Sequence, residues 1–264
     1  MDARIRHRRR IAALLLATFL LAPGDRQAAS QEKREVELTA QEIVARVDRI
    51  MNYPVGLIKG RMLHVSPDGK SSAIDFVANT TDTDFLFTFS TRDRGDSIRV
   101  LYNFSGEDIW VYSIHAMRLF HKVGVDKYDP IYGTNFTFVD FSNADLQSNF
   151  TAQITGDAIV KNMESYRLRL TPIYKGGQYG QLNLYVSKSD FVPLRIDYHD
   201  NDKVIFKTLS VVQTISKGNR IIPTRYDMLD IKKGTVTIVT FFGFDEKASY
   251  DKSIFRHQTL GDRR

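Results

Sequence analysis

The sequence of 264 residues predicts a mainly β protein, in which a single antiparallel sheet curls on itself behind one N-terminal helix and a short helical lid. Three observations support this fold class. The chain has 17 Phe and 12 Tyr but one Trp, a balance that favours strands. From Gly56 onward apolar residues recur at every second position, which is the period of a strand. Short turn sequences such as Pro67-Asp68-Gly69 and Lys217-Gly218-Asn219 separate these segments, as in hairpins.

Residues 1–30 have the pattern of a secretory signal peptide. Five arginines between Arg4 and Arg10 precede the apolar run Ile11–Ala22, whose twelve residues are too few to span a bilayer. Ala28-x-Ser30 places small residues before a cleavage site at Gln31. We expect export and cleavage near Ser30, with residues 31–264 forming a single domain; an uncleaved membrane anchor is the alternative.

Cleavage changes the charge of the chain. Residues 1–30 hold six Arg and two Asp, so 31 basic and 29 acidic residues remain, a net charge of +2. A nucleic-acid-binding protein needs a basic stripe in its mature chain, and none is visible, so we expect no nucleic-acid partner. The chain has no cysteine, which excludes disulfides, thiolate metal sites, cysteine nucleophiles and a lipid attached through cysteine.

One amphipathic helix is predicted at the start of the mature chain. Thr39 and Glu42 have the spacing of a capping box, in which each side chain accepts a hydrogen bond from the other residue's backbone amide. Tyr53-Pro54 is expected to end the helix. The apolar residues at helical spacing are Ile43, Val44, Val47, Ile50 and Met51.

About ten or eleven strands with short connections are expected after the helix. They form a meander with one apolar and one hydrated face, and an open sheet of this size must curl or close. One helix cannot cover the whole apolar face of such a sheet. We therefore expect a concavity lined with aromatic and aliphatic side chains.

The segment Val125–Asn149 breaks the strand rhythm. Thr137 with Asp140 can cap a short helix, and Phe138, Phe141 and Leu146 would share roughly one side of it. A long aromatic loop inside a compact meander is more often functional than idle. Two interpretations remain open: the segment covers the concavity as a lid, or it plugs the core.

No catalytic or metal-binding motif is present. The chain contains no G-x-S-x-G sequence, and its six histidines have no H-x-x-x-H or H-E-x-x-H spacing. The aspartates 126, 129, 140 and 145 do not follow the pattern of a calcium loop. We therefore expect no enzyme, no cofactor, no catalytic residue and no metal site.

A set of short motifs resembles the outer-membrane lipoprotein-sorting protein family, the relatives of the LolA-type periplasmic carriers. The resemblance covers roughly Gln41 to Leu260, and its most specific part is Gly133–Phe141, similar to G-[ST]-D-F-[ST]-[YF]-x-D-[LF] with Asn135 at the usual Asp. The other motifs are Gly60-Arg61-Met62, Asp108-Ile109-Trp110-Val111-Tyr112, Gly234-Thr235-x-Thr237 and Phe255–Leu260.

The resemblance implies an incomplete β-barrel closed by a helical lid, with a hydrophobic cavity for acyl chains. It further implies a bacterial periplasmic carrier or chaperone that takes lipid or acylated lipoprotein cargo from an inner-membrane transporter toward an outer-membrane acceptor, acting as a monomer. The residues expected to line the cavity and its lid are Met62, Phe76, Phe85, Phe87, Phe89, Trp110, Tyr112, Phe136, Phe138, Phe141 and Leu146. Within this set Trp110 is expected to face the concavity beside Tyr112; the alternative is that it serves only in core packing.

Two other functions remain open. The same fold can serve as a sensing or structural module that binds lipid or lipoprotein and regulates a partner. A hydrolase acting on a lipid in the cavity would need a nucleophile with a base in reach, and no local motif supplies one.

Overall fold

The computed structural model describes residues 38–93, 95–142, 145–174 and 176–262. The predicted signal peptide, residues 1–30, lies outside these ranges. Helix α1 (Ala40–Met51) begins at the predicted capping box: Glu42 N donates to Thr39 Oγ1 at 3.3 Å, and Thr39 N donates to Glu42 Oε2 at 2.8 Å. No helix among the described residues is long and apolar enough to cross a membrane.

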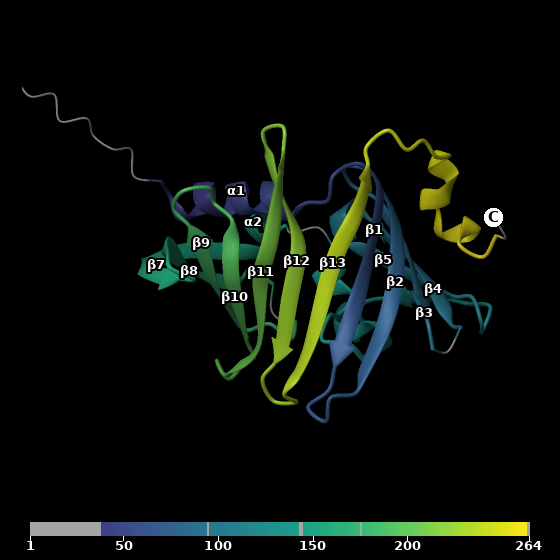
Figure 1. Cartoon of the computed structure of the whole chain (residues 1–264), viewed down its shortest axis with the longest axis horizontal. Coiled ribbons are helices and arrows are strands. Elements are labelled where there is room, and N and C mark those ends of the chain that lie inside the picture. Colours follow the sequence, from purple (N-terminus) through teal and green to yellow (C-terminus); the bar gives the residue numbers. More distant parts are fainter. Residues whose placement is uncertain (1–37, 94, 143–144, 175, 263–264) are drawn as a thin grey trace, which may run out of the picture. The chain divides into compact units, whose positions relative to one another are not determined.

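Thirteen strands form one antiparallel sheet in the described part of the chain (Figure 1). The strands are β1 (Gly56–Val65), β2 (Ser71–Thr80), β3 (Phe85–Thr91), β4 (Ser97–Asn103), β5 (Asp108–Ser113), β6 (Arg118–Lys122), β7 (Phe150–Val160), β8 (Met163–Pro172), β9 (Gln181–Ser187), β10 (Pro193–His199), β11 (Ile205–Lys217), β12 (Arg220–Asp230) and β13 (Thr235–Asp245).

The sheet consists of two meanders joined in the middle. Its order is β6-β5-β4-β3-β2-β1-β13-β12-β11-β10-β9-β8-β7, so β1 pairs with β13 while β6 and β7 form the two edges. The described residues contain no pairing between β6 and β7, and the sheet is not closed into a barrel. The sequence prediction of a mainly β, incompletely closed antiparallel sheet is therefore confirmed.

The predicted strand number, about ten or eleven, is too low, and the edge strand β6 carries no alternation in burial. All five residues of β6 are exposed or half-buried, with no buried position among them. β7 likewise has no buried residue along its length. On β7, Phe150, Ala152 and Ile154 are only partly buried against the core, so one face of this edge strand is weakly covered.

A connection that we name the crossing segment (residues 123–142 and 145–149) leads from the edge strand β6 to the opposite edge strand β7. It contains the 3₁₀ turns η2 (Gly124–Tyr128), η3 (Ile131–Gly133) and η4 (Val139–Phe141) and the one-turn helix α2 (Leu146–Asn149). Its apolar residues from Tyr128 onward join the main core, so this part of the segment packs on the inner face of the sheet.

The inner face has a dense aromatic core in the half formed by β1–β5. The rings of Phe76, Phe87 and Phe89 pack against one another with centroids 5.4–5.9 Å apart, and each meets the ring of Phe141 edge-on. Gly60 makes room for them, because a Cβ at this position would lie 2.2 Å from Phe76 Cζ. Packed rings from the sheet and from Phe141 fill the space beside this half of the sheet.

The outer face of β3–β5 is covered by the C-terminal part of the chain. Here η5 (Lys252–Phe255) and η6 (His257–Thr259) place Ile254, Phe255 and Leu260 against Leu101 and its neighbours, forming a second, smaller core. Arg99 Nη1 donates to the carbonyl oxygens of Leu260 and Asp262, both at 2.7 Å, and holds the end of this covering in place.

Candidate functional site

A cavity of about 680 Å³ lies on the inner face, between strands β9–β13 and the crossing segment. This volume is within the usual range for sites that bind small organic ligands. Its sheet wall is mainly apolar and consists of Leu182, Ile196, Leu209, Val239 and Phe241, with Tyr198 and Tyr226, and Tyr179 borders it from the loop before β9. Its other walls include Phe136, Val139, Phe141, Leu146 and Phe150, together with Met51 and Tyr53.

Strand register builds the sheet wall. Leu182 lies opposite Tyr198, Ile196 opposite Leu209, and Tyr226 opposite Val239 in successive antiparallel pairs. Since directly opposed residues point to the same face of a sheet, these side chains form one continuous surface across five strands. The cavity therefore follows from the pairing of β9–β13.

The crossing segment supplies the facing wall through one tight turn. Thr137 N and Thr137 Oγ1 both donate to Asp140 Oδ2 at 2.8 Å, and η4 follows directly. The short helix expected from Thr137 and Asp140 is present as this single 3₁₀ turn, which aims Val139 and Phe141 at the cavity.

Two of the motifs that carry the family resemblance meet in the fold. Asn135 Nδ2 donates to the carbonyl oxygens of Met228 (2.9 Å) and Thr235 (2.8 Å), and Thr235 Oγ1 donates to Asn135 Oδ1 at 2.7 Å. Asn135 N also donates to Thr237 Oγ1 at 3.0 Å. All the polar atoms of a buried amide are thus satisfied, which fixes the crossing segment to the β12–β13 hairpin.

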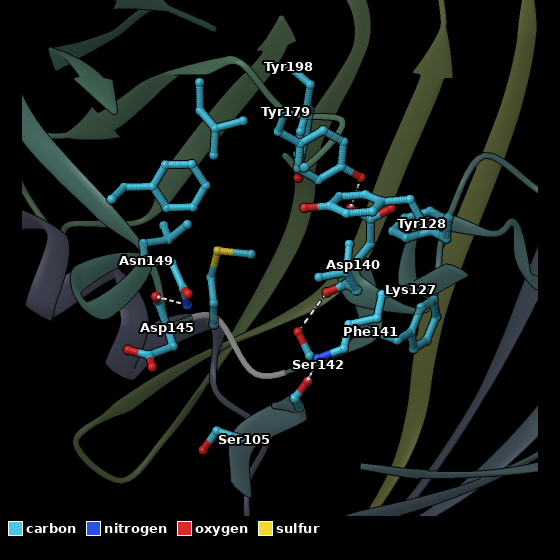
Figure 2. Close-up of a pocket in the computed structure, with 18 of the residues that line it drawn as sticks. Ser105, Lys127, Tyr128, Asp140, Phe141, Ser142, Asp145, Asn149, Tyr179 and Tyr198 are labelled. Carbon is cyan, nitrogen blue, oxygen red and sulfur yellow. Dashed lines mark hydrogen bonds between the residues drawn. The ribbon is translucent and has the colours of Figure 1, made fainter. Parts of the chain in front are cut away.

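A buried ionic cluster, formed by Asp140, Lys207 and Tyr179, joins the crossing segment to the sheet. Lys207 Nζ lies 2.7 Å from Asp140 Oδ2, and the two side chains are only 5% and 4% exposed. Tyr179 Oη donates to Asp140 Oδ1 at 2.8 Å, and Lys207 Nζ lies 4.7 Å from the ring centroids of Tyr179 and Tyr198. Figure 2 shows Asp140, Tyr128, Tyr179 and Tyr198 gathered on one side of the cavity, across from Asp145 and Asn149.

Burial governs the protonation of this cluster. Removal from water lowers the pKa of Lys207, and the adjacent Asp140 carboxylate opposes that effect. Burial also raises the pKa of Tyr179 well above its usual value, and the nearby Asp140 charge adds to the effect. The phenol therefore stays neutral and can donate to Asp140.

Asp48 links α1 to α2 at the edge of the cavity. Its carboxylate accepts hydrogen bonds from Leu146 N and Gln147 N, each at 3.0 Å. Burial raises the pKa of Asp48 to about 6, against the lowering effect of these two bonds.

The raised pKa of Asp48 predicts a pH-dependent stability. The folded protein binds this proton more tightly than the unfolded chain, whose ordinary value is 3.8, so the contribution to stability is full below about pH 4 and is lost as the pH rises to about 6. The loss should be about 2–3 kcal/mol. Urea unfolding of the wild type and Asp48→Asn from pH 4 to pH 7 measures it. A difference between the two proteins that stays constant across this range would contradict the assignment.

Three of the predicted site residues, Phe136, Phe141 and Leu146, line the cavity. The other inner-face residues of the prediction are buried in the core without lining it: Met62, Phe76, Phe85, Phe87, Phe89 and Phe138. Their half of the sheet is filled by packed rings, whereas the cavity lies against the other half.

The expectation that Trp110 and Tyr112 face the concavity is wrong. On β5 the alternating residues Ile109 and Val111 join the inner core, so Trp110 and Tyr112 point to the outer face and pack under the C-terminal residues. Trp110 is stacked between His121 and His257, with centroids 4.0 and 4.2 Å away.

Sequence reasoning did not identify the β9–β13 wall or the Lys207 position. The residues of β9 and β10 alternate in the same way as those of β3, so no pattern separates a wall that faces space from one that faces packed rings. Lys207 has no motif around it, and its burial follows only from its place opposite Asp140.

Comparison with known proteins supports the architecture. A family model described as "Uncharacterized protein" matches residues 80–262. No curated protein matches the chain.

Three solved structures share the fold. A DUF1329 family protein from Desulfovibrio piger is 18% identical with a TM-score of 0.72, covering 84% of this chain and 97% of that one. An outer membrane lipoprotein-sorting protein domain from Vibrio parahaemolyticus is 15% identical with a TM-score of 0.72, covering 84% and 98%. A LolA superfamily protein from Nitrosomonas europaea is 19% identical with a TM-score of 0.67, covering 83% and 98%. The chain therefore belongs to the family whose model matches residues 80–262, and its fold is that of the outer-membrane lipoprotein-sorting and LolA superfamily proteins.

Proposed function

We propose that this protein is a non-enzymatic carrier that binds the acyl chains of lipids or lipoproteins in the inner-face cavity. The observation that carries the proposal is the cavity itself, whose sheet wall is mainly apolar and whose facing wall adds the apolar side chains of Phe136, Val139, Phe141 and Leu146 beside polar ones. An acyl chain gains ~0.8 kcal/mol per buried methylene, so ten methylenes would contribute roughly 8 kcal/mol before the costs of association.

The fold and the N-terminal sequence support a periplasmic location for this carrier. Solved structures with the same fold include a lipoprotein-sorting domain. The signal-peptide pattern of residues 1–30 favours export to the periplasm with cleavage near Ser30 and a mature domain of residues 31–264. We propose transfer toward the outer membrane, with an inner-membrane transporter as donor and an outer-membrane protein as acceptor.

A cavity-filling substitution tests the proposal. Leu209 is 4% exposed and lines the cavity, so Leu209→Trp should occupy acyl-chain space and weaken binding of a fluorescent fatty acid at least about tenfold. The matched control is Ser210→Trp, one residue along β11 and on the opposite face.

The melting temperature of each variant shows whether it is folded. Saturable binding by the wild type and by Ser210→Trp, with loss in a folded Leu209→Trp, supports the proposal. Equal affinity in all three proteins would place the fatty acid outside the cavity and refute it.

A further inference from the structure

Exposed apolar side chains lie beside the cavity, on the loops that contribute to its lining. Phe104 is 68% exposed, Val123 53%, Val125 66% and Tyr174 77%. We name these four residues the rim. Phe104 and Tyr174 line the cavity directly, and so does Gly124, which lies between the two valines.

Three separate loops contribute the rim, and contacts hold them together. Lys127 Nζ donates to the carbonyl oxygens of Gly106 and Glu107, which connects the 3₁₀ turn η1 (Phe104–Gly106) to η2. Tyr128 Oη packs against Gly177, where a Cβ would lie only 2.3 Å from the phenol oxygen. This contact connects η2 to the loop after β8, so the rim is one continuous surface.

The exposed ring of Phe104 is not part of the packed core. Its φ of +50° lies in the left-handed region, where residues other than glycine are uncommon, and its ring remains in solvent. Backbone strain that displays an apolar ring at a cavity mouth is typical of a binding surface rather than of a core.

The charges around the rim indicate the kind of partner. Glu107, Asp126 and Asp129 are exposed acidic residues, whereas the basic residues Lys122 and Lys127 are half-buried, and Lys122 Nζ pairs with Asp129 Oδ2 at 2.7 Å. Among the described residues beside the rim, basic side chains therefore do not outnumber acidic ones, and they give no preference for anionic headgroups. Exposed aromatic and branched aliphatic side chains beside balanced charges suit the boundary between headgroups and acyl chains of a neutral bilayer.

We propose that the rim docks this protein on a neutral lipid surface, with the cavity mouth facing the acyl chains. The inference rests on the proposed carrier function, because docking in this orientation lets a chain enter the cavity without crossing water. Docking depends on apolar contact and is therefore insensitive to salt.

Flotation with phosphatidylcholine vesicles tests the rim. The wild type should float with the vesicles equally at about 0.1 M and about 0.5 M salt. The double variant Val123→Ser/Val125→Ser should lose vesicle affinity about tenfold, and Phe104→Ser should also weaken it. The control is Phe242→Ser, which removes a ring 61% exposed on the outer face of β13 and should float as the wild type does.

Three results would overturn docking on a neutral bilayer: no flotation of the wild type, equal flotation of the double variant, or flotation that requires anionic lipid and disappears in salt. The first result would be expected if the rim instead contacts a protein.

Fatty-acid binding separates this inference from the carrier proposal. Neither Val123 nor Val125 lines the cavity, so their double variant should keep fatty-acid binding while losing vesicles. If the wild type binds vesicles but binds no fatty acid, the carrier function is refuted and the docking of the rim on lipid is not.

Discussion

Alanine in place of Phe141 is expected to lower the free energy of unfolding by about 3–5 kcal/mol, as for a fully packed core phenylalanine. Phe141 is 2% exposed and meets the rings of Phe76, Phe87, Phe89 and Phe136 at centroid distances of 5.4–6.0 Å. A ring held by four others cannot be removed without leaving a void.

Urea unfolding of Phe141→Ala, beside Phe87→Ala on the sheet and Phe242→Ala in solvent, measures this cost. The first two variants should lose similar stability, and Phe242→Ala should lose less than about 1 kcal/mol. A loss below about 1 kcal/mol for Phe141→Ala would mean that the crossing segment is a loosely held lid. Phe141 fits both interpretations of the segment, a lid over the concavity and a plug of the core, because it lines the cavity and also packs in the core.

Separating Asp140 from Lys207 is the second change with a large expected effect. Lys207→Met leaves the Asp140 carboxylate buried without its cation, and Asp140→Asn leaves the ammonium without its anion. Each single substitution should cost about 3–5 kcal/mol, because an uncompensated charge stays on a nearly fully buried side chain.

A double-mutant cycle measures the coupling between the two side chains. Asp140→Asn with Lys207→Met should cost much less than the sum of the two single losses, since neither charge remains. The matched control is Arg61 with Asp75, an ion pair 2.6 Å apart on half-exposed side chains, for which the coupling should be below about 1 kcal/mol. Additive losses within about 0.5 kcal/mol for Asp140 and Lys207 would show that the cluster does not hold the crossing segment to the sheet.

Local signals were enough to predict the helix and the sheet. The capping box of Thr39 and Glu42 sets the start of α1, and strict alternation in β3 identifies a half-buried strand. These features depend on neighbours in sequence, where the spacing of residues determines the geometry.

The faces of the sheet could not be predicted in the same way. Alternation groups Trp110 with Tyr112 but does not say which face is inside, and Ile109 and Val111 are equally apolar. The C-terminal residues that cover Trp110 lie more than 140 positions away in the chain. A long-range contact of this kind leaves no local trace in a single sequence.

The position of the cavity was also beyond the sequence. Phe87 and Leu209 both face inward. Packed rings fill the space beside Phe87, whereas the cavity lies beside Leu209. The empty volume is the space that the curved sheet encloses minus the summed volume of the side chains inside it. A residue pattern specifies neither quantity.

Native mass spectrometry of the wild-type and Leu209→Trp proteins, purified from a bacterial periplasm without detergent, tests the central claim most directly. The claim is that the cavity holds an acyl chain. We predict that the wild type carries an additional mass that lipid extraction identifies as acylated, and that the folded Leu209→Trp protein carries much less of it. A wild type with the mass of the polypeptide alone, which also binds no added fatty acid, would contradict the claim.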